Sequence, residues 1–367
     1  LDQIIFLQPW LDSIQASDGL AIFATPFTNY TGGYVGVLWG WSLAGPLLSD
    51  QAILKLASLT GTALLALSAG LLLRRAGLPR WESLFGGLLT LALPSVMMNG
   101  ASHAQADAFY TAFCLLCLAA LMADRRVLAG VAFCAALSFK LQAIFLAPFL
   151  AGVMLRDWRA VALSALALIP TYLVVNGLYV AAGRPVIDVL MIYGTQADTY
   201  REISMNAANP WFLIQTVLSE DAHDAAYREM VLVGLALASV AGLAIPMATL
   251  RARPTEPSDL LFWAATSALA MPFLLPKMHD RYFFLGEVLL LLLALTDRRF
   301  WPAALLAQVS AVFIYAIYFD VTGLSTVLSD PALGTVGVTF MGLTLMSFAR
   351  ARKGGARAEG DAHPSPA

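Results

Sequence analysis

Charged residues are scarce in this chain of 367 residues. Asp, Glu, Lys and Arg make up 13% of it, against about 25% in soluble globular domains. Hydrophobic residues reach 59% and the mean hydropathy is +0.73. This composition excludes an ordinary soluble domain and indicates an integral membrane protein. The chain also lacks a basic stripe, which argues against a nucleic-acid partner.

Cysteine is equally scarce, and Cys114, Cys117 and Cys134 all lie inside apolar runs. The spacing C-L-L-C is that of a redox motif, but in a membrane helix we favour simple packing. His223, in the acidic run EDAHD, has no second histidine at ligand spacing. The sequence thus requires no cofactor and leaves the role of a divalent metal open. Because the chain begins at Leu1 with no methionine or signal-like segment, we expect a leading segment before it.

What the chain does contain is a series of apolar runs. A membrane-spanning helix needs about 20 mostly apolar residues. We expect spans near residues 53–73, 83–99, 106–123, 127–139, 143–155, 160–181, 230–250, 260–275, 282–296, 300–319 and 332–349. The sequence therefore predicts an all-α, polytopic bundle, with re-entrant or juxtamembrane helices on its external face.

The polar segments complete this predicted organisation. We expect one transmembrane domain over residues 1–353, with spans at about 53–349 and external loops at 1–52 and about 183–229. The tail, residues 354–367, is rich in glycine, alanine and proline, and we expect it to be disordered in the cytoplasm.

Lysine and arginine set the predicted orientation, because they accumulate on the cytoplasmic side. Fifteen of the 22 Lys and Arg residues then lie inside and 7 outside. This pattern requires a hairpin over residues 127–155 that turns at residues 138–142, since a single 29-residue span would invert everything downstream.

Residues 34–48 leave two alternatives open. If they span the membrane, the region before them lies in the cytosol. If they lie at the outer interface, which Trp39 and Trp41 favour, that region faces outside.

Ionisable residues recur at the ends of the runs on the external face. They are Asp2, Asp107, Lys140, Lys277, His279, Asp280 and Arg281. Ionisable groups at membrane depth are costly, so they usually face a cavity and serve a function. Cations beside a carboxylate suit a phosphate-bearing ligand and a proton acceptor. The alternative is that they are interfacial anchors or paired charges at helix ends.

Four segments carry a resemblance to a known family. PKMHDRYFF, followed by an apolar run, resembles a segment of the GT-C class of sugar transferases that use polyprenyl-phosphate sugars. Within that class the chain is similar to the bacterial relatives of the second mannosyltransferase of GPI-anchor synthesis, the PIG-V type. HAQADAFYTAF resembles its W-G-Q-x-D-A-x-Y segment, and LAGVAFCAALSFKLQAIFLAPFL resembles its glycine-led hairpin. DQIIFLQPWLDSI with FTNYTGGYVGVLW resembles its first external loop.

Two positions depart from the family pattern. His103-Ala104 replaces Trp-Gly, and Gly32-Gly33 replaces a pair of prolines. The first departure bears on the selectivity for sugar or acceptor, and the second loosens a turn that prolines would rigidify.

The resemblance implies roles for ten residues. Asp2 would be the catalytic base; Lys140, Lys277, His279 and Arg281 would bind the donor phosphate; Gln105, Asp107, Asn29, Tyr30 and Gln142 would bind sugar or acceptor. Several of these residues have a simpler alternative, which for Asn29 and Tyr30 is a place in a buried turn. Asp2 is then a solvated chain end or a helix cap, Asp107 a helix cap, and Lys140 a residue that snorkels to the headgroups. Asp280 either pairs with one of the cations or is an exposed rim charge.

The implied activity is transfer of a hexose, mannose by family expectation, from a polyprenyl-phosphate donor to an acceptor hydroxyl with inversion. The acceptor would be a lipid, a glycan or a protein, on the outer face of a bacterial plasma membrane. A transporter or lipid-linked-sugar flippase is the alternative, but it should show repeat symmetry and charges near the midplane. A catalytically inactive relative that binds lipid phosphate is a third interpretation.

Overall fold

The computed structural model describes residues 3–194, 202–318, 323 and 326–362, with side chains as far as residue 354. The chain divides into two compact units. The first unit is Leu1–Glu202 with Gly242–Ser267, and the second is Ile203–Ala241 with Ala268–Ala367. The predicted single transmembrane domain and disordered tail stay predictions.

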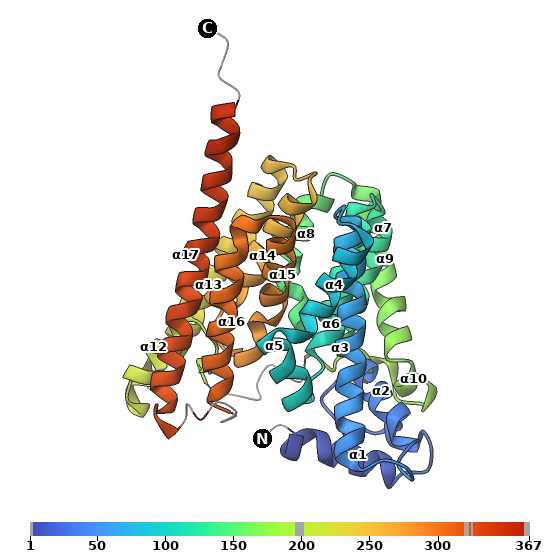
Figure 1. Ribbon diagram of the computed structural model, residues 1–367. Coiled ribbons are helices and arrows are strands. Elements are labelled where there is room, and N and C mark those ends of the chain that lie inside the picture. Colours follow the sequence, from blue (N-terminus) through green and yellow to red (C-terminus); the bar gives the residue numbers. More distant parts are fainter. Residues whose placement is uncertain (1–2, 195–201, 319–322, 324–325, 363–367) are drawn as a thin grey trace. The chain divides into compact units, whose positions relative to one another are not determined.

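The first unit is built from helices of very different lengths. In chain order they are η1 (Gln3–Leu7), α1 (Gln8–Gln15), η2 (Ala21–Ala24), α2 (Gly32–Ser42), α3 (Asp50–Arg75), α4 (Arg80–Leu89), η3 (Thr90–Ala92), α5 (Pro94–Val96), η4 (Met97–Ser102), α6 (Asp107–Met122), α7 (Arg126–Phe139), η5 (Leu141–Leu146), α8 (Ala147–Met154), α9 (Trp158–Val175), α10 (Gly177–Ala181) and α11 (Val186–Leu190). Helix α6 packs against α3 on one side and α7 on the other, and α7 packs in turn on α9 (Figure 1).

Two long helices divide between the units, and the remaining elements belong to the second. The shared helices are α13 (Glu220–Ala252) and α14 (Pro257–Leu274). The second unit adds β1 (Ser204–Met205), α12 (Pro210–Val217), β2 (Met278–His279), η6 (Asp280–Phe283), α15 (Phe284–Thr296), η7 (Arg298–Phe300), α16 (Trp301–Ala316) and α17 (Asp330–Ala362). Helix α16 packs along α17 and also against α15. Every residue from Phe284 to Ala294 is buried, so α15 is a core helix. It is apolar on all faces except at Glu287, a buried carboxylate in its first turn.

The predicted all-α polytopic fold is confirmed. Within the described part of the chain, five helices are long and apolar enough to cross a membrane. They are Asp50–Arg75, Trp158–Val175, Glu220–Ala252, Arg298–Ala316 and Asp330–Gly354. The only strands among the described residues are the two-residue β1 and β2.

The run at residues 83–99 is not one helix as predicted. Leu93 is extended (φ −63°, ψ 128°) and the helices before and after it meet at a bend of 57°. Pro94 explains the break, because a proline disfavours helical backbone at the preceding residue and cannot continue the helix before it. The segment is a broken span or a re-entrant loop.

The predicted hairpin at residues 127–155 is present. Helix α7 ends at Phe139, and Lys140 is extended (φ −158°, ψ 135°) before η5 and α8 begin. An Nη1 atom of Arg126, at the start of α7, lies 3.8 Å from an Oδ2 atom of Asp157, just beyond α8. The chain therefore returns to its starting level instead of continuing as a single 29-residue span.

The apolar segment at residues 34–48 forms a helix of only 11 residues, α2. At 1.5 Å per residue such a helix is about 16 Å long, roughly half the thickness of a bilayer core. Helix α2 by itself is therefore too short to span the membrane.

Candidate active site

Asp107 is the first residue of α6 and lies at the centre of a buried polar cluster. Its Oδ1 atom is 2.8 Å from the Nζ atom of Lys140, and its Oδ2 atom accepts a hydrogen bond from Nδ2 of Asn99 at 2.9 Å. The side chain of Asp107 is fully buried. The residue that caps α6 is Ala106, which offers no side-chain bond. Asp107 therefore directs its carboxylate to a cation and an amide, and the N-cap alternative does not describe it.

Lys140 is buried as well, with 7% of its surface exposed, so it does not snorkel to the surface. It occupies the extended break between α7 and η5. Two hydroxyl groups fix the backbone just before it: Thr31 donates to the carbonyl of Phe139 at 2.9 Å, and Tyr193 donates to the carbonyl of Leu137 at 2.7 Å. Burial raises the pKa of the Tyr193 phenol above its usual range, so the hydroxyl stays protonated and available as a donor.

Tyr30 connects the first loop to this cluster. The Nζ atom of Lys140 lies 5.7 Å from the centre of the Tyr30 ring, within the range of a cation–π interaction. The Tyr30 hydroxyl donates to Oε1 of Gln105 at 3.2 Å. The Tyr30 ring also contacts Trp10 of α1, with ring centres 5.0 Å apart. We call Tyr30, Asn99, Gln105, Asp107 and Lys140 the Asp107 cluster.

The backbone before Asp107 has an unusual conformation. Ala104 has a φ of 54°, in the left-handed region that favours glycine. Its carbonyl accepts a hydrogen bond from the buried hydroxyl of Tyr34 at 2.9 Å, and Ser58 donates to the carbonyl of Gln105 at 2.7 Å. Burial raises the pKa of Tyr34, which keeps this donor protonated. Ala104 thus adopts a left-handed backbone that glycine would accommodate with less strain.

Two other predicted residues of the first unit lie outside the Asp107 cluster. Asn29 is exposed in the loop before α2. Gln142 is half-buried in η5, and its Oε1 atom has no hydrogen-bond partner among the described residues. Asp2, the predicted base, lies outside the described residues; the nearest described element is η1, which leads into α1 and Trp10.

The segment PKMHDRY belongs to the second unit. Lys277 has a φ of 60° and its N–H donates to the carbonyl of Ile203 at 2.7 Å. β2 then pairs in parallel with β1, so that His279 lies beside Met205. Asp280 is buried, with an Oδ1 atom 3.8 Å from Nη1 of Arg281. Asp280 is therefore a buried partner of a neighbouring cation and not an exposed rim charge.

The structure therefore brings the predicted residues together in two groups, one in each unit. Tyr30, Gln105, Asp107 and Lys140 form the first group. Lys277, His279, Asp280 and Arg281 form the second. Asn99 was missed by sequence reasoning, because only the π-helical turns of η4 bring an amide eight residues upstream onto Asp107.

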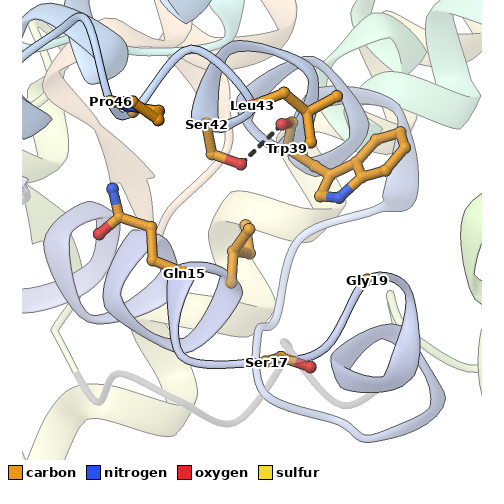
Figure 2. Close-up of a pocket in the computed structure, with 9 residues that line it drawn as sticks. Gln15, Ser17, Gly19, Trp39, Ser42, Leu43 and Pro46 are labelled. Carbon is orange, nitrogen blue, oxygen red and sulfur yellow. Dashed lines mark hydrogen bonds between the residues drawn. The ribbon is translucent and has the colours of Figure 1, made fainter.

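A pocket of about 350 Å³ lies in the first unit between the end of α1 and the end of α2 (Figure 2). No predicted site residue lines it. Its lining is uncharged and consists of Ile14, Gln15, Ser17, Gly19, Trp39, Ser42, Leu43, Gly45 and Pro46. The Ser42 hydroxyl donates to the carbonyl of Trp39 at 2.7 Å and so helps to end α2.

The three cysteines are free thiols buried in α6 and α7, which agrees with a role in packing. In the described part of the chain, no three His, Cys, Asp or Glu side chains gather as metal ligands would.

A model of a known protein family matches much of the chain. The model of glycosyltransferase family 87 matches residues 21–276, more than half of the chain. The matched segment includes the whole Asp107 cluster. No curated protein matches the chain. The match supports a glycosyltransferase in general and not the PIG-V type in particular. With its membrane-spanning helices and this match, the chain belongs to glycosyltransferase family 87 and is a membrane glycosyltransferase.

Proposed function

We propose that this glycosyltransferase moves one hexose from a polyprenyl-phosphate carrier to an acceptor hydroxyl on the non-cytoplasmic face. The observation that carries the proposal is the Asp107 cluster, a buried carboxylate and ammonium at a helix break in a family 87 chain. Charged groups inside a membrane protein are costly and usually functional. Mannose is the sugar that the resemblance to the PIG-V type favours.

The reaction is a single displacement with inversion. The acceptor oxygen forms a bond to the anomeric carbon while the bond from that carbon to the phosphate oxygen breaks. The phosphate oxygen keeps the electron pair and leaves as polyprenyl phosphate. The acceptor proton goes to a carboxylate, for which Asp2 is our candidate. Cations that hold the departing phosphate lower the barrier, because negative charge develops there in the transition state.

The residues divide into three roles under this proposal. Asp2 takes the proton. Lys140, Lys277, His279 and Arg281 hold the phosphate, and Asp280 balances part of the charge of Arg281. Tyr30 and Gln105, joined by a hydrogen bond, present a hydroxyl and an amide to sugar hydroxyls. Asp107, Asn29 and Gln142 complete the group that binds the sugar or the acceptor.

The experiment is reconstitution of the full chain in liposomes with a panel of donors. Polyprenyl-phosphate mannose, glucose and galactose are offered with a lipid extract as acceptor, and nucleotide sugars are offered in parallel. We expect release of polyprenyl phosphate and label in the acceptor with one polyprenyl donor. Consumption of nucleotide sugars alone, or of no donor by folded protein, would contradict the proposal.

Two further readings test the alternatives. A flippase would move intact donor between leaflets without cleaving it. Asp2→Asn should abolish transfer and keep donor binding, while Asp12→Asn, an exposed carboxylate in α1, should leave both unchanged. Normal transfer by the Asp2→Asn variant would show that Asp2 is not the catalytic base. If the wild-type chain binds the donor but transfers no sugar, the chain is a catalytically inactive relative that binds lipid phosphate.

A further inference from the structure

Arg184 is a buried cation without a counter-charge in the described part of the first unit. Only 8% of its surface is exposed, and its guanidinium carbon lies 5.0 Å from the centre of the Tyr179 ring. Its Nη1 atom is buried and has no hydrogen-bond partner among the described residues. None of the ion pairs between described residues includes Arg184, and Asp188, four residues on, is exposed.

The local backbone places Arg184 there. Helix α10 ends at Ala181, and Gly183 turns the chain with a φ of 89°. The N–H of Arg184 then donates to the carbonyl of Tyr179 at 3.0 Å, five residues back. This is the hydrogen bond of a Schellman motif, in which the residue after the glycine packs back on the last turn of the helix. Gly183, Arg184 and Pro185 thus direct the guanidinium onto the Tyr179 ring.

Lys140 and Arg184, two buried cations of the first unit, differ in how their charge is balanced. Lys140 is also buried, but Asp107 balances its charge at 2.8 Å. Arginine stays protonated at any accessible pH, and a buried charge without a partner is strongly destabilising. Stacking on a tyrosine ring offsets only part of that cost. An anion bound to Arg184 would supply the missing partner.

The surroundings of Arg184 favour an anion carried on a lipid. Val186, Ile187 and Met191 on and after α11 are exposed apolar side chains, with 44%, 64% and 54% of their surfaces accessible. Apolar tails would cover these side chains while a phosphate reached the guanidinium, whose planar fork matches phosphate geometry.

The position also connects to the Asp107 cluster. The Tyr179 hydroxyl donates to the backbone carbonyl of Tyr30 at 2.9 Å, so a single tyrosine joins the guanidinium to the loop that carries Tyr30. We propose that Arg184 and the Tyr179 face form a binding site for a phosphoryl group carried on a lipid. With the proposed function as its basis, that lipid is the polyprenyl-phosphate donor or product; a membrane phospholipid has the same phosphate chemistry.

The test measures lipid binding by the purified full chain in detergent, without requiring transfer. The probes are polyprenyl phosphate, polyprenol with the same tail, phosphatidylglycerol and inorganic phosphate. Arg184→Met removes the charge and keeps an apolar stem, so we expect a ligand-free Tm equal to or above that of the wild type. Arg184→Gln is the second variant. Arg159→Gln is the matched control, because Arg159 also stacks on an aromatic ring, that of Trp158 at 5.6 Å, but is exposed.

We expect both Arg184 variants to bind polyprenyl phosphate at least tenfold more weakly, with polyprenol binding and the Arg159→Gln variant unchanged. Loss restricted to polyprenyl phosphate identifies the donor or product as the ligand. Equal loss for phosphatidylglycerol identifies a membrane lipid, and then the lipid-phosphate site stands without the donor assignment. Wild-type affinity for every anionic lipid in both variants, or no binding of any anionic lipid by the wild type, overturns the site.

Discussion

Lys140 and Asp107 are buried charges of opposite sign, and each depends on the other. The ammonium and carboxylate atoms are 2.8 Å apart, and Asn99 satisfies the second carboxylate oxygen. Replacement of one member of such a pair leaves the other charged and unpaired, which costs about 3–5 kcal/mol. Replacement of both members removes that penalty.

Lys140→Gln and Asp107→Asn should each lower the free energy of unfolding by about 3–5 kcal/mol, and the double variant should lose less than the sum. The comparable pair Arg126–Asp157 is partly exposed, at 38% and 37%, so the corresponding single changes should cost about 1 kcal/mol or less. Unfolding monitored in detergent measures both cycles. Strictly additive losses at Lys140 and Asp107 would contradict the pairing.

Ala104 holds a left-handed backbone that alanine tolerates poorly. Ala104→Gly should raise the free energy of unfolding by about 1 kcal/mol, because relief of backbone strain exceeds the added entropy of the unfolded chain. Ala112→Gly, inside α6, is the control and should lower it by about 1 kcal/mol. The thermal unfolding midpoint of each variant is compared with that of the wild type. A lower midpoint for Ala104→Gly would mean that the φ angle of Ala104 is not left-handed.

At the scale of elements, small residues allow the helices of the first unit to approach closely. A Cβ atom added at Gly130 of α7 would overlap the side chain of Ser164 on α9. Likewise, a Cβ atom at Gly87 of α4 would lie 2.5 Å from the carbonyl oxygen of Ala66 on α3. Close packing of this kind replaces the hydrophobic effect, which does not drive helices together within a membrane.

Gly130→Ala should therefore destabilise the first unit, since α9 must move away from α7. Ser164→Gly in the same chain should restore much of the stability, because the two atoms that the added Cβ atom would overlap belong to the Ser164 side chain, and the next nearest atom, the Cα atom of residue 164, lies at 3.4 Å. Gly242→Ala in α13, where no atom lies within 4 Å of an added Cβ, is the control and should be neutral or stabilising. Failure of Ser164→Gly to rescue would show that the clash is not the cause.

At the scale of the whole molecule, the alternation of basic residues predicts which helix ends face the cytoplasm. The hairpin at residues 126–157 is the element on which that alternation depends, and its return is seen in the Arg126–Asp157 contact. The side of the membrane on which each end lies is part of the proposed function.

Single cysteines should report that orientation directly. Asn29 and Glu82 are both exposed, and the three native thiols are buried. In intact spheroplasts a membrane-impermeant maleimide should label Asn29→Cys, whereas Glu82→Cys should react only after permeabilisation. The unsubstituted chain should stay unlabelled. The opposite labelling pattern would place the Asp107 cluster at the cytoplasmic face and overturn the proposed topology.

The sequence by itself determined the membrane class and most helix positions, since hydropathy is a local property of consecutive residues. The predicted run at 53–73 became α3, Asp50–Arg75, and the run at 106–123 became α6, Asp107–Met122. Pro94 could also have predicted the helix break, but the apolar run continues on both sides of the proline, so a single span was predicted there. Asp107 and Lys140 were chosen as candidates from their depth between apolar runs.

Only the tertiary structure decided which charges are balanced. Lys140 pairs with Asp107, which lies 33 positions earlier in the chain. Asn99, in η4, donates a hydrogen bond to the same carboxylate. Arg184 lies in a segment that the sequence presents as an external loop, yet the fold buries it on Tyr179 with no ion-pair partner among the described residues. Charge pairing and burial depend on side chains that meet in space, so no local pattern of residues specifies them.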